Sequence, residues 1–264
     1  MSVEFKSEKD THQLLIDGEV WLLPSEPYSV QYHLQYRRLA DGQMAIGYLE
    51  SESEYENPFD AEWYTIYSFN RRHSNFKTLE DIDAQRLVHP QNRHLPQILA
   101  WYGHGGEVWA LRGELPAGCD CPFDSLNFAG IWLPSAACCD QIRRDVLMKM
   151  IEGRTDGQAY LQRILCRQRK PSNTALRNWL TAHGGVDVAA LREAEVENAM
   201  VYARGACRTW TAYANGDVFR TRLIILDAAG ELTLDEYGGT CYGSDECDRE
   251  IKMWLDGFDA PTSE

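Results

Sequence analysis

The sequence of 264 residues has no hydrophobic run that approaches the roughly 18 apolar residues of a membrane-spanning helix. Its first ten residues include five charged side chains and no apolar core, so no secretory signal peptide is expected there. We therefore expect a protein of the reducing cytoplasm, whose eight cysteines do not form a disulfide framework.

The cysteines also lack the paired C-x2-C spacing that holds a tetrahedral zinc ion. Cys119 and Cys121 have one residue between them, and Cys138 and Cys139 are adjacent. We expect no metal site and no cofactor, and we predict that the cysteines serve as small buried hydrophobic residues.

Common catalytic signatures are missing as well, namely G-x-S-x-G, G-x-x-x-x-G-K-[ST], H-E-x-x-H and G-x-G-x-x-G. His104, within a glycine-rich stretch, is interpreted as a turn residue. A nucleophilic couple of Cys121 with His73 requires a proximity that the sequence does not indicate. No catalytic residue is assigned, and an enzyme of unrecognised motif stays an alternative.

Basic residues are few, since 26 Lys and Arg stand against 40 Asp and Glu, a formal net charge of −14. Such a chain repels phosphate backbones and anionic membranes, which disfavours a general nucleic-acid coat protein and a membrane-surface protein. Hydrophobic residues make up 44% of the sequence, which is typical of a globular protein with a core.

The patterns that are present in the first half of the chain favour antiparallel strands. Asp17 and Gly18 stand between two apolar runs and predict a hairpin over residues 14–23. Residues 28–37 alternate with a period of two, which predicts a single strand. Further strands are expected at 44–49, 63–69, 98–102, 108–111 and 128–133.

The hydrophobic period then becomes helical. Ile142, Val146 and Met150 recur every four residues and predict a helix over 137–152. Shorter helices are expected near 161–165, at 175–183 and at 188–202. Strands are then expected at 208–214, 218–226 and 231–234, before a last helix from Ser244.

This order predicts an α+β fold, with an antiparallel β-sheet, flanking helices and an inserted helical block, because strands and helices do not alternate regularly. Residues 1–152 are expected to form a β-rich α+β core. Residues 153–205 are predicted to be the helical insertion, and residues 206–264 a β-meander and C-terminal helix that complete the core.

Charge is distributed unevenly along the chain. Residues 141–177 carry nine bases and three acids, a charge of +6, which leaves −20 for the remainder. In this basic helical block we expect residues that bind nucleic acid or an acidic partner. They are Arg163, Arg167, Arg169, Lys170 and Arg177. The alternative is a solvated helix face that pairs with the acidic remainder.

Residues 50–62 are predicted to form an acidic loop with six acids and no base. The acids are Glu50, Glu52, Glu54, Glu56, Asp60 and Glu62. Carboxylates spaced along a rigid surface can imitate a phosphate backbone for a protein whose groove binds nucleic acid. The alternative is an ordinary acidic surface.

Several short motifs, taken in order, resemble a family of uncharacterised bacteriophage and plasmid proteins. They are Asn57-Pro58, Asn70-Arg71-Arg72-His73, Tyr102-Gly103-His104-Gly105-Gly106, Cys121-Pro122-Phe123-Asp124-Ser125 and Gly216-Asp217-Val218-Phe219. His73 replaces the tyrosine typical of the family, and residues 154–195 stand out as inserted. The resemblance implies a mobile-element origin and a compact α+β fold, and it supplies no activity.

These observations favour a mobile-element anti-defence protein, an anti-CRISPR or antirestriction inhibitor. We expect it to bind stoichiometrically to a basic, nucleic-acid-binding defence complex in the cytoplasm of the host bacterium. A nucleic-acid contact through residues 154–177 is a further expectation, and no membrane partner is expected. The alternative is a nucleic-acid-binding accessory or regulatory protein that uses the basic helical block.

Overall fold

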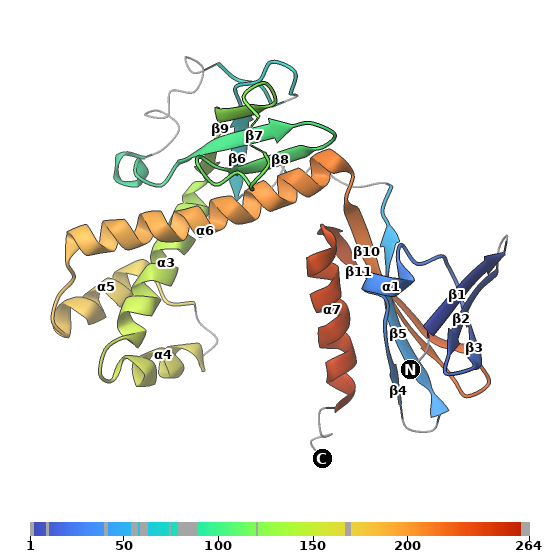
Figure 1. Ribbon diagram of the computed structural model, residues 1–264. Coiled ribbons are helices and arrows are strands. Elements are labelled where there is room, and N and C mark those ends of the chain that lie inside the picture. Colours follow the sequence, from blue (N-terminus) through green and yellow to red (C-terminus); the bar gives the residue numbers. More distant parts are fainter. Residues whose placement is uncertain are drawn as a thin grey trace. The chain divides into compact units, whose positions relative to one another are not determined.

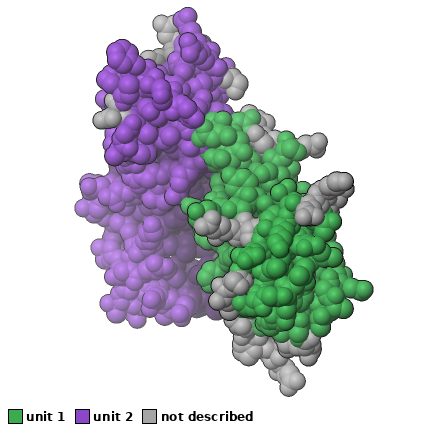
Figure 2. All heavy atoms as spheres, turned by 45° about the vertical axis from the view of Figure 1, so that its right-hand side comes forward, with its two compact units in different colours: residues 1–56, 212–264 green, residues 57–211 purple. Residues whose placement is uncertain are grey.

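The computed structural model describes residues 3–8, 11–39, 42–53, 58, 63–73, 75–78, 89–119, 121–166 and 170–259 (Figure 1). The described part of the chain contains helices and three antiparallel sheets, which confirms the α+β class. The chain divides into two compact units (Figure 2). Unit 1 comprises residues 1–56 and 212–264, and unit 2 comprises residues 57–211.

Unit 1 contains a three-stranded sheet, sheet A, in the order β1 (Val3–Glu8), β2 (Thr11–Ile16) and β3 (Glu19–Leu23). The predicted hairpin of residues 14–23 is confirmed. Its turn residues, Asp17 and Gly18, have φ angles of 51° and 87°, the left-handed conformations that a tight two-residue turn requires.

A four-stranded sheet, sheet B, completes the strands of unit 1 in the order β11 (Leu232–Tyr242), β10 (Val218–Leu226), β5 (Met44–Ser51) and β4 (Gln35–Arg38). The single strand predicted over 28–37 is wrong, because the short helix α1 (Val30–His33) precedes β4. Contacts with residues that are distant in the sequence, rather than the alternating pattern, determine the local structure here. The ring of Tyr28 packs 4.5 Å from that of Phe219, and the His33 imidazole bonds to Asp248 at 2.9 Å.

Both faces of sheet B are covered within unit 1. Met44, Ile46 and Tyr48 of β5 share a core with sheet A. The opposite face packs against helix α7 (Ser244–Asp256), which runs beside the sheet in Figure 1. The packing at Gly47 is so close that a Cβ atom there would lie 2.5 Å from Cγ2 of Ile251.

Unit 2 begins with a third sheet, sheet C, in the order β6 (Tyr64–Ser68), β9 (Ser125–Pro134), β7 (Gln97–Gly103) and β8 (Glu107–Leu111). The strands predicted at 63–69, 98–102, 108–111 and 128–133 are confirmed. A single 3-10 turn, η3 (Pro90–Asn92), precedes β7.

The described helices of unit 2 are α3 (Ala136–Glu152), α4 (Gly157–Leu165), α5 (Asn173–Ala182) and most of α6 (Val188–Asn215). Their shared core includes Leu147, Leu161, Leu176 and Leu191. The Ser135 and Ser172 hydroxyls accept hydrogen bonds from first-turn N–H groups and start α3 and α5.

The strand predicted at 208–214 is wrong, because α6 continues to Asn215. Its buried residues Ala203, Cys207 and Trp210 are spaced by four and three, which is the helical period. A 3-10 turn, η4 (Gly257–Asp259), follows α7 in unit 1. None of the helices in the described ranges is long and apolar enough to span a membrane.

Candidate functional site

A buried ion pair in unit 2 joins Arg143 of α3 to Glu195 of α6. The Nε of Arg143 donates to Oε1 of Glu195 at 3.0 Å, and its Nη2 donates to Oδ1 of Asn92 at 2.8 Å. Only 7% of Arg143 and 3% of Glu195 are exposed. An unpaired charge at this depth is very unfavourable, so each group requires the other.

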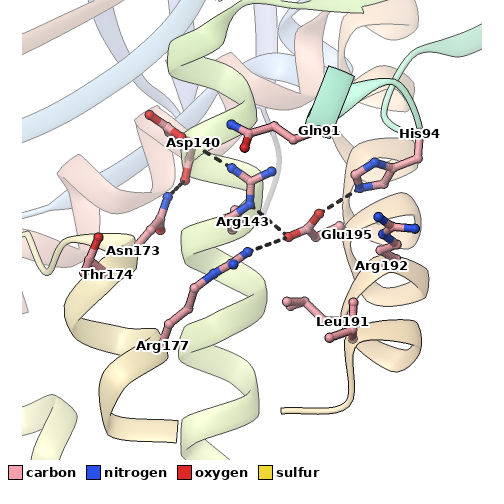
Figure 3. Close-up of a pocket in the computed structure, with 11 residues that line it drawn as sticks. Gln91, His94, Asp140, Arg143, Asn173, Thr174, Arg177, Leu191, Arg192 and Glu195 are labelled. Carbon is pink, nitrogen blue, oxygen red and sulfur yellow. Dashed lines mark hydrogen bonds and ion pairs between the residues drawn. The ribbon is translucent and has the colours of Figure 1, made fainter. Parts of the chain in front are cut away.

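Two further side chains reach the same carboxylate from the solvent side. The Nε2 atom of His94 lies 2.7 Å from Oε2 of Glu195, and Nη2 of Arg177 lies 3.9 Å from Oε1. Figure 3 shows Arg143, His94 and Arg177 converging on Glu195 from three separate segments. The His94 side chain is 24% exposed and that of Arg177 49%, so Glu195 connects the buried ion pair to an open surface.

A cavity of about 360 Å³ opens beside this cluster. Its cationic lining is formed by Arg143, Arg177 and Arg192, and aliphatic lining comes from Val188 and Leu191. A volume of this size is in the range of small-molecule sites, about 300–1,000 Å³. The lining combines groups that attract an anion with groups that contact carbon atoms.

Polar groups that line the same cavity add hydrogen-bonding capacity. Gln91, Asn173 and Thr174 line it together with Asp140, whose carboxylate lies 3.6 Å from Nη1 of Arg143. The amide nitrogen of Asn173 donates to the main-chain oxygen of Asp140 at 3.0 Å. Its Oδ1 is buried and has no hydrogen-bond partner among the described residues.

The predicted basic residues are only partly brought together. Arg177 lines the cavity, whereas Arg163 lies exposed on α4 and does not line it. Lys170 is exposed just before α5. Arg167 and Arg169 lie outside the described residues.

The structure gives two of the predicted acidic residues internal partners. Glu50 lies at the end of β5, inside the segment predicted as a loop, and bonds to the buried Arg222 at 2.9 Å. Glu52 lies 3.5 Å from Nε of Arg220, and the side chains of both acids are less than 15% exposed. These two carboxylates therefore stabilise unit 1. Glu54, Glu56, Asp60 and Glu62 lie outside the described residues.

Acidic residues are concentrated in unit 1. Its sequence contains 23 acidic and 8 basic residues, a formal charge of −15, whereas that of unit 2 contains 17 and 18, a charge of +1. Glu231, Glu236, Asp245 and Glu246 are exposed and form no ion pair with another residue in the described part of the chain. Unit 1 thus presents free carboxylates on β11, on α7 and in the turn before β11.

Residues of the motifs that resemble the phage and plasmid family lie close together on sheet C. Tyr102 pairs with Ser125 across β7 and β9, and the Ser125 hydroxyl donates to the carbonyl of Cys121 at 2.8 Å. The His104 ring lies 3.2 Å from the Asp124 carboxylate at an exposed turn, which confirms its interpretation as a turn residue. These motif residues hold turns together, as Asp and Ser commonly do.

His73, in the first of these motifs, is a partly buried histidine rather than one partner of a Cys–His couple. Its Nδ1 bonds to the Ser68 hydroxyl at 2.7 Å, and its ring packs against Trp101 and Trp109. Burial lowers the pKa of His73, and the charge of Glu107 at 3.5 Å opposes that effect. The neutral imidazole therefore fits its aromatic surroundings.

Most cysteines are buried, as predicted, with one clear exception. Cys138, Cys139, Cys207, Cys241 and Cys247 are buried, whereas Cys166 is exposed and the remaining two are intermediate. Burial raises the pKa of Cys138 to about 12 and that of Cys139 to about 11, so both are neutral thiols at physiological pH. No potential metal-binding group of three or more His, Cys, Asp or Glu occurs in the described ranges.

Sequence reasoning missed Glu195, His94 and the role of Arg143. One available signal was the position of Glu195, four residues after Leu191 and four before Ala199, both of which are buried. A charge at such a position on a helix requires a partner. Comparisons with protein-family models, curated proteins and solved structures find no match.

Proposed function

We propose that the protein is a phage or plasmid anti-defence protein, an anti-CRISPR or antirestriction inhibitor that binds stoichiometrically to a nucleic-acid-handling complex in the bacterial cytoplasm. The observation that carries the proposal is the charge of −15 in unit 1. The resemblance of the motifs to phage and plasmid proteins supports the same class.

The physical basis is electrostatic complementarity. Complexes that cut or bind nucleic acid have basic grooves, which attract an acidic surface and are blocked when it binds. Glu231, Glu236 and Glu246 supply exposed carboxylates from the packed elements of unit 1. The acids of residues 54–62, which lie outside the described residues, stay predicted partner contacts.

The test is co-elution of the purified protein with CRISPR effector complexes and restriction enzymes, followed by competition with their DNA. We expect one target to bind in a fixed ratio and to lose DNA binding. Phage challenged by that system should plate more efficiently on cells that express the protein.

A matched pair of variants tests the surface. Glu231→Gln, Glu236→Gln and Glu246→Gln together should weaken target binding at least tenfold, roughly the effect of one lost charged contact. Glu152→Gln, Glu193→Gln and Glu197→Gln remove the same charge from exposed positions of unit 2 and should leave binding unchanged. Equal weakening by both variants, or no bound defence complex, contradicts the proposal.

A nucleic-acid-binding accessory role is the second candidate, favoured by the exposure of Arg163 and Lys170. Neither side chain forms an ion pair with another residue of the described ranges. Binding to DNA or RNA should then fall steeply with salt, because bound counterions are released from the nucleic acid. Gel-shift titrations between 50 and 300 mM NaCl measure this salt dependence. If neither DNA nor RNA is shifted at the lowest salt concentration, the nucleic-acid-binding role is rejected.

A further inference from the structure

We propose that the cavity beside Glu195 in unit 2 binds a small phosphate monoester that carries hydroxyl groups, a sugar phosphate or a nucleotide. This site is separate from the acidic surface of unit 1 and does not depend on the proposed anti-defence function. Some of the charged and hydrogen-bonding groups that line the cavity have partners within the protein, and others remain available to a ligand.

Part of the positive charge that lines the cavity is not balanced by ion pairs within the protein. Arg143 is neutralised by Glu195 at 3.0 Å and also faces Asp140 at 3.6 Å. Arg192 forms no ion pair with any described residue, and Arg177 has only its contact of 3.9 Å with Glu195. Two guanidinium groups therefore remain to bind an anion, and a phosphate monoester carries a charge of about −1.5 to −2 at pH 7.

The cavity also contains hydrogen-bond acceptors. Figure 3 places Asp140 and Asn173 on one side of Arg143, with His94 and Arg192 on the other. The buried Oδ1 of Asn173 lacks a donor among the described residues, and the exposed Asp140 carboxylate has accepting capacity left. A hydroxyl group of a ligand can therefore donate to the exposed Asp140 carboxylate.

His94 and the aliphatic residues complete the recognition of such a ligand. Glu195 fixes the His94 ring through Nε2, which leaves Nδ1 available for a hydrogen bond to the ligand. Val188 and Leu191 provide an apolar wall for the carbon skeleton. The arrangement binds a phosphorylated polyol better than either the phosphate or the polyol alone.

The test is isothermal titration calorimetry of the full chain with four probes: ribose 5-phosphate, AMP, inorganic phosphate and ribose. We expect at least one of the two phosphate esters to bind at least tenfold more tightly than both inorganic phosphate and ribose. The relative affinities of ribose 5-phosphate and AMP then distinguish a sugar phosphate from a nucleotide.

Variants assign the binding to this cavity. Arg177→Gln and Arg192→Gln should each weaken binding of the ester roughly tenfold or more, as expected for a lost charged hydrogen bond. Arg208→Gln removes the same charge from an exposed position of α6 outside the cavity and should leave binding unchanged. Asp140→Asn should reduce the preference for the two esters over inorganic phosphate, because only the esters carry a hydroxyl group that can donate to this carboxylate.

The exposed positions of Arg177 and Arg192 make these substitutions compatible with folding, which circular dichroism verifies. The inference is overturned if neither ester binds at millimolar concentration, if ribose binds as tightly as the esters, or if Arg208→Gln weakens binding as much as the cavity variants. Because the probes are small molecules, these outcomes are independent of any defence complex.

Discussion

Among single residues of unit 2, Glu195 lies within ion-pair distance of three side chains, those of His94, Arg143 and Arg177. We predict that Glu195→Ala lowers the free energy of unfolding by about 3–5 kcal/mol, because it leaves the buried Arg143 charge unpaired. Urea denaturation at pH 7 measures the loss.

Replacement of both partners separates charge from packing. The double variant Arg143→Met with Glu195→Leu should recover most of the stability, because it removes both buried charges at similar volume. If the single variant is as stable as the wild type, the ion pair does not have the energetic role that its burial indicates.

Arg222 of unit 1 gives a second prediction for single residues. Its guanidinium bonds twice to Asp235 at 2.9 Å and lowers the pKa of that carboxyl group. A carboxyl whose pKa is lowered by folding adds stability above its unfolded pKa and loses it as pH falls through the folded pKa. Asp235→Asn should therefore destabilise unit 1 at pH 7.

The pH series supplies the control for this variant. The difference in urea midpoint between Asp235→Asn and the wild type should shrink as pH falls from about 5 through the unfolded pKa of about 3.9 and then through the lower folded pKa, because Asp235 is then neutral in both states. A difference that stays constant over this range shows that the lost stability has another origin.

For whole elements, the packing of α7 on β5 gives the clearest test. Gly47→Ala should lower the free energy of unfolding by about 1–3 kcal/mol, because the new Cβ overlaps Cγ2 of Ile251. Ile251→Ala alone should reduce it by about 2–5 kcal/mol through the cavity that it leaves. In the Ile251→Ala background, Gly47→Ala should be much less harmful, and additive effects contradict the close contact.

Elements with local signals were predictable from the sequence. The Asp17-Gly18 turn, the Ser135 and Ser172 helix starts and the period of α3 are all encoded within a few residues. The errors at residues 28–37 and 208–214 arise where local composition favours strands and tertiary packing decides otherwise.

The candidate site was less predictable than the fold. Arg177 was found because it belongs to a run of basic residues. Glu195 and His94 lie about a hundred residues apart in the sequence and meet only through the packing of α6 and the segment before β7. No local sequence pattern predicts a contact between two residues so far apart in the chain.

For the whole molecule, the important quantity is how the fold groups the charges. The basic block of residues 141–177 folds in unit 2 with acids from other segments, and its charge of +6 is reduced to +1. The acidity remains in unit 1. Association through unit 1 should therefore slow markedly between 50 and 500 mM NaCl, as stopped-flow mixing with the target complex can measure.

The same acidity has a consequence for β11, an outer strand of sheet B that is mostly exposed over its 11 residues. An open strand edge invites pairing with a second molecule, and the exposed charge of Glu236 opposes it. Near the isoelectric point of about 4.9 the net repulsion between molecules vanishes. Mild acid is thus the condition under which this protein should aggregate, and its solubility rests on the carboxylates proposed to bind its partner.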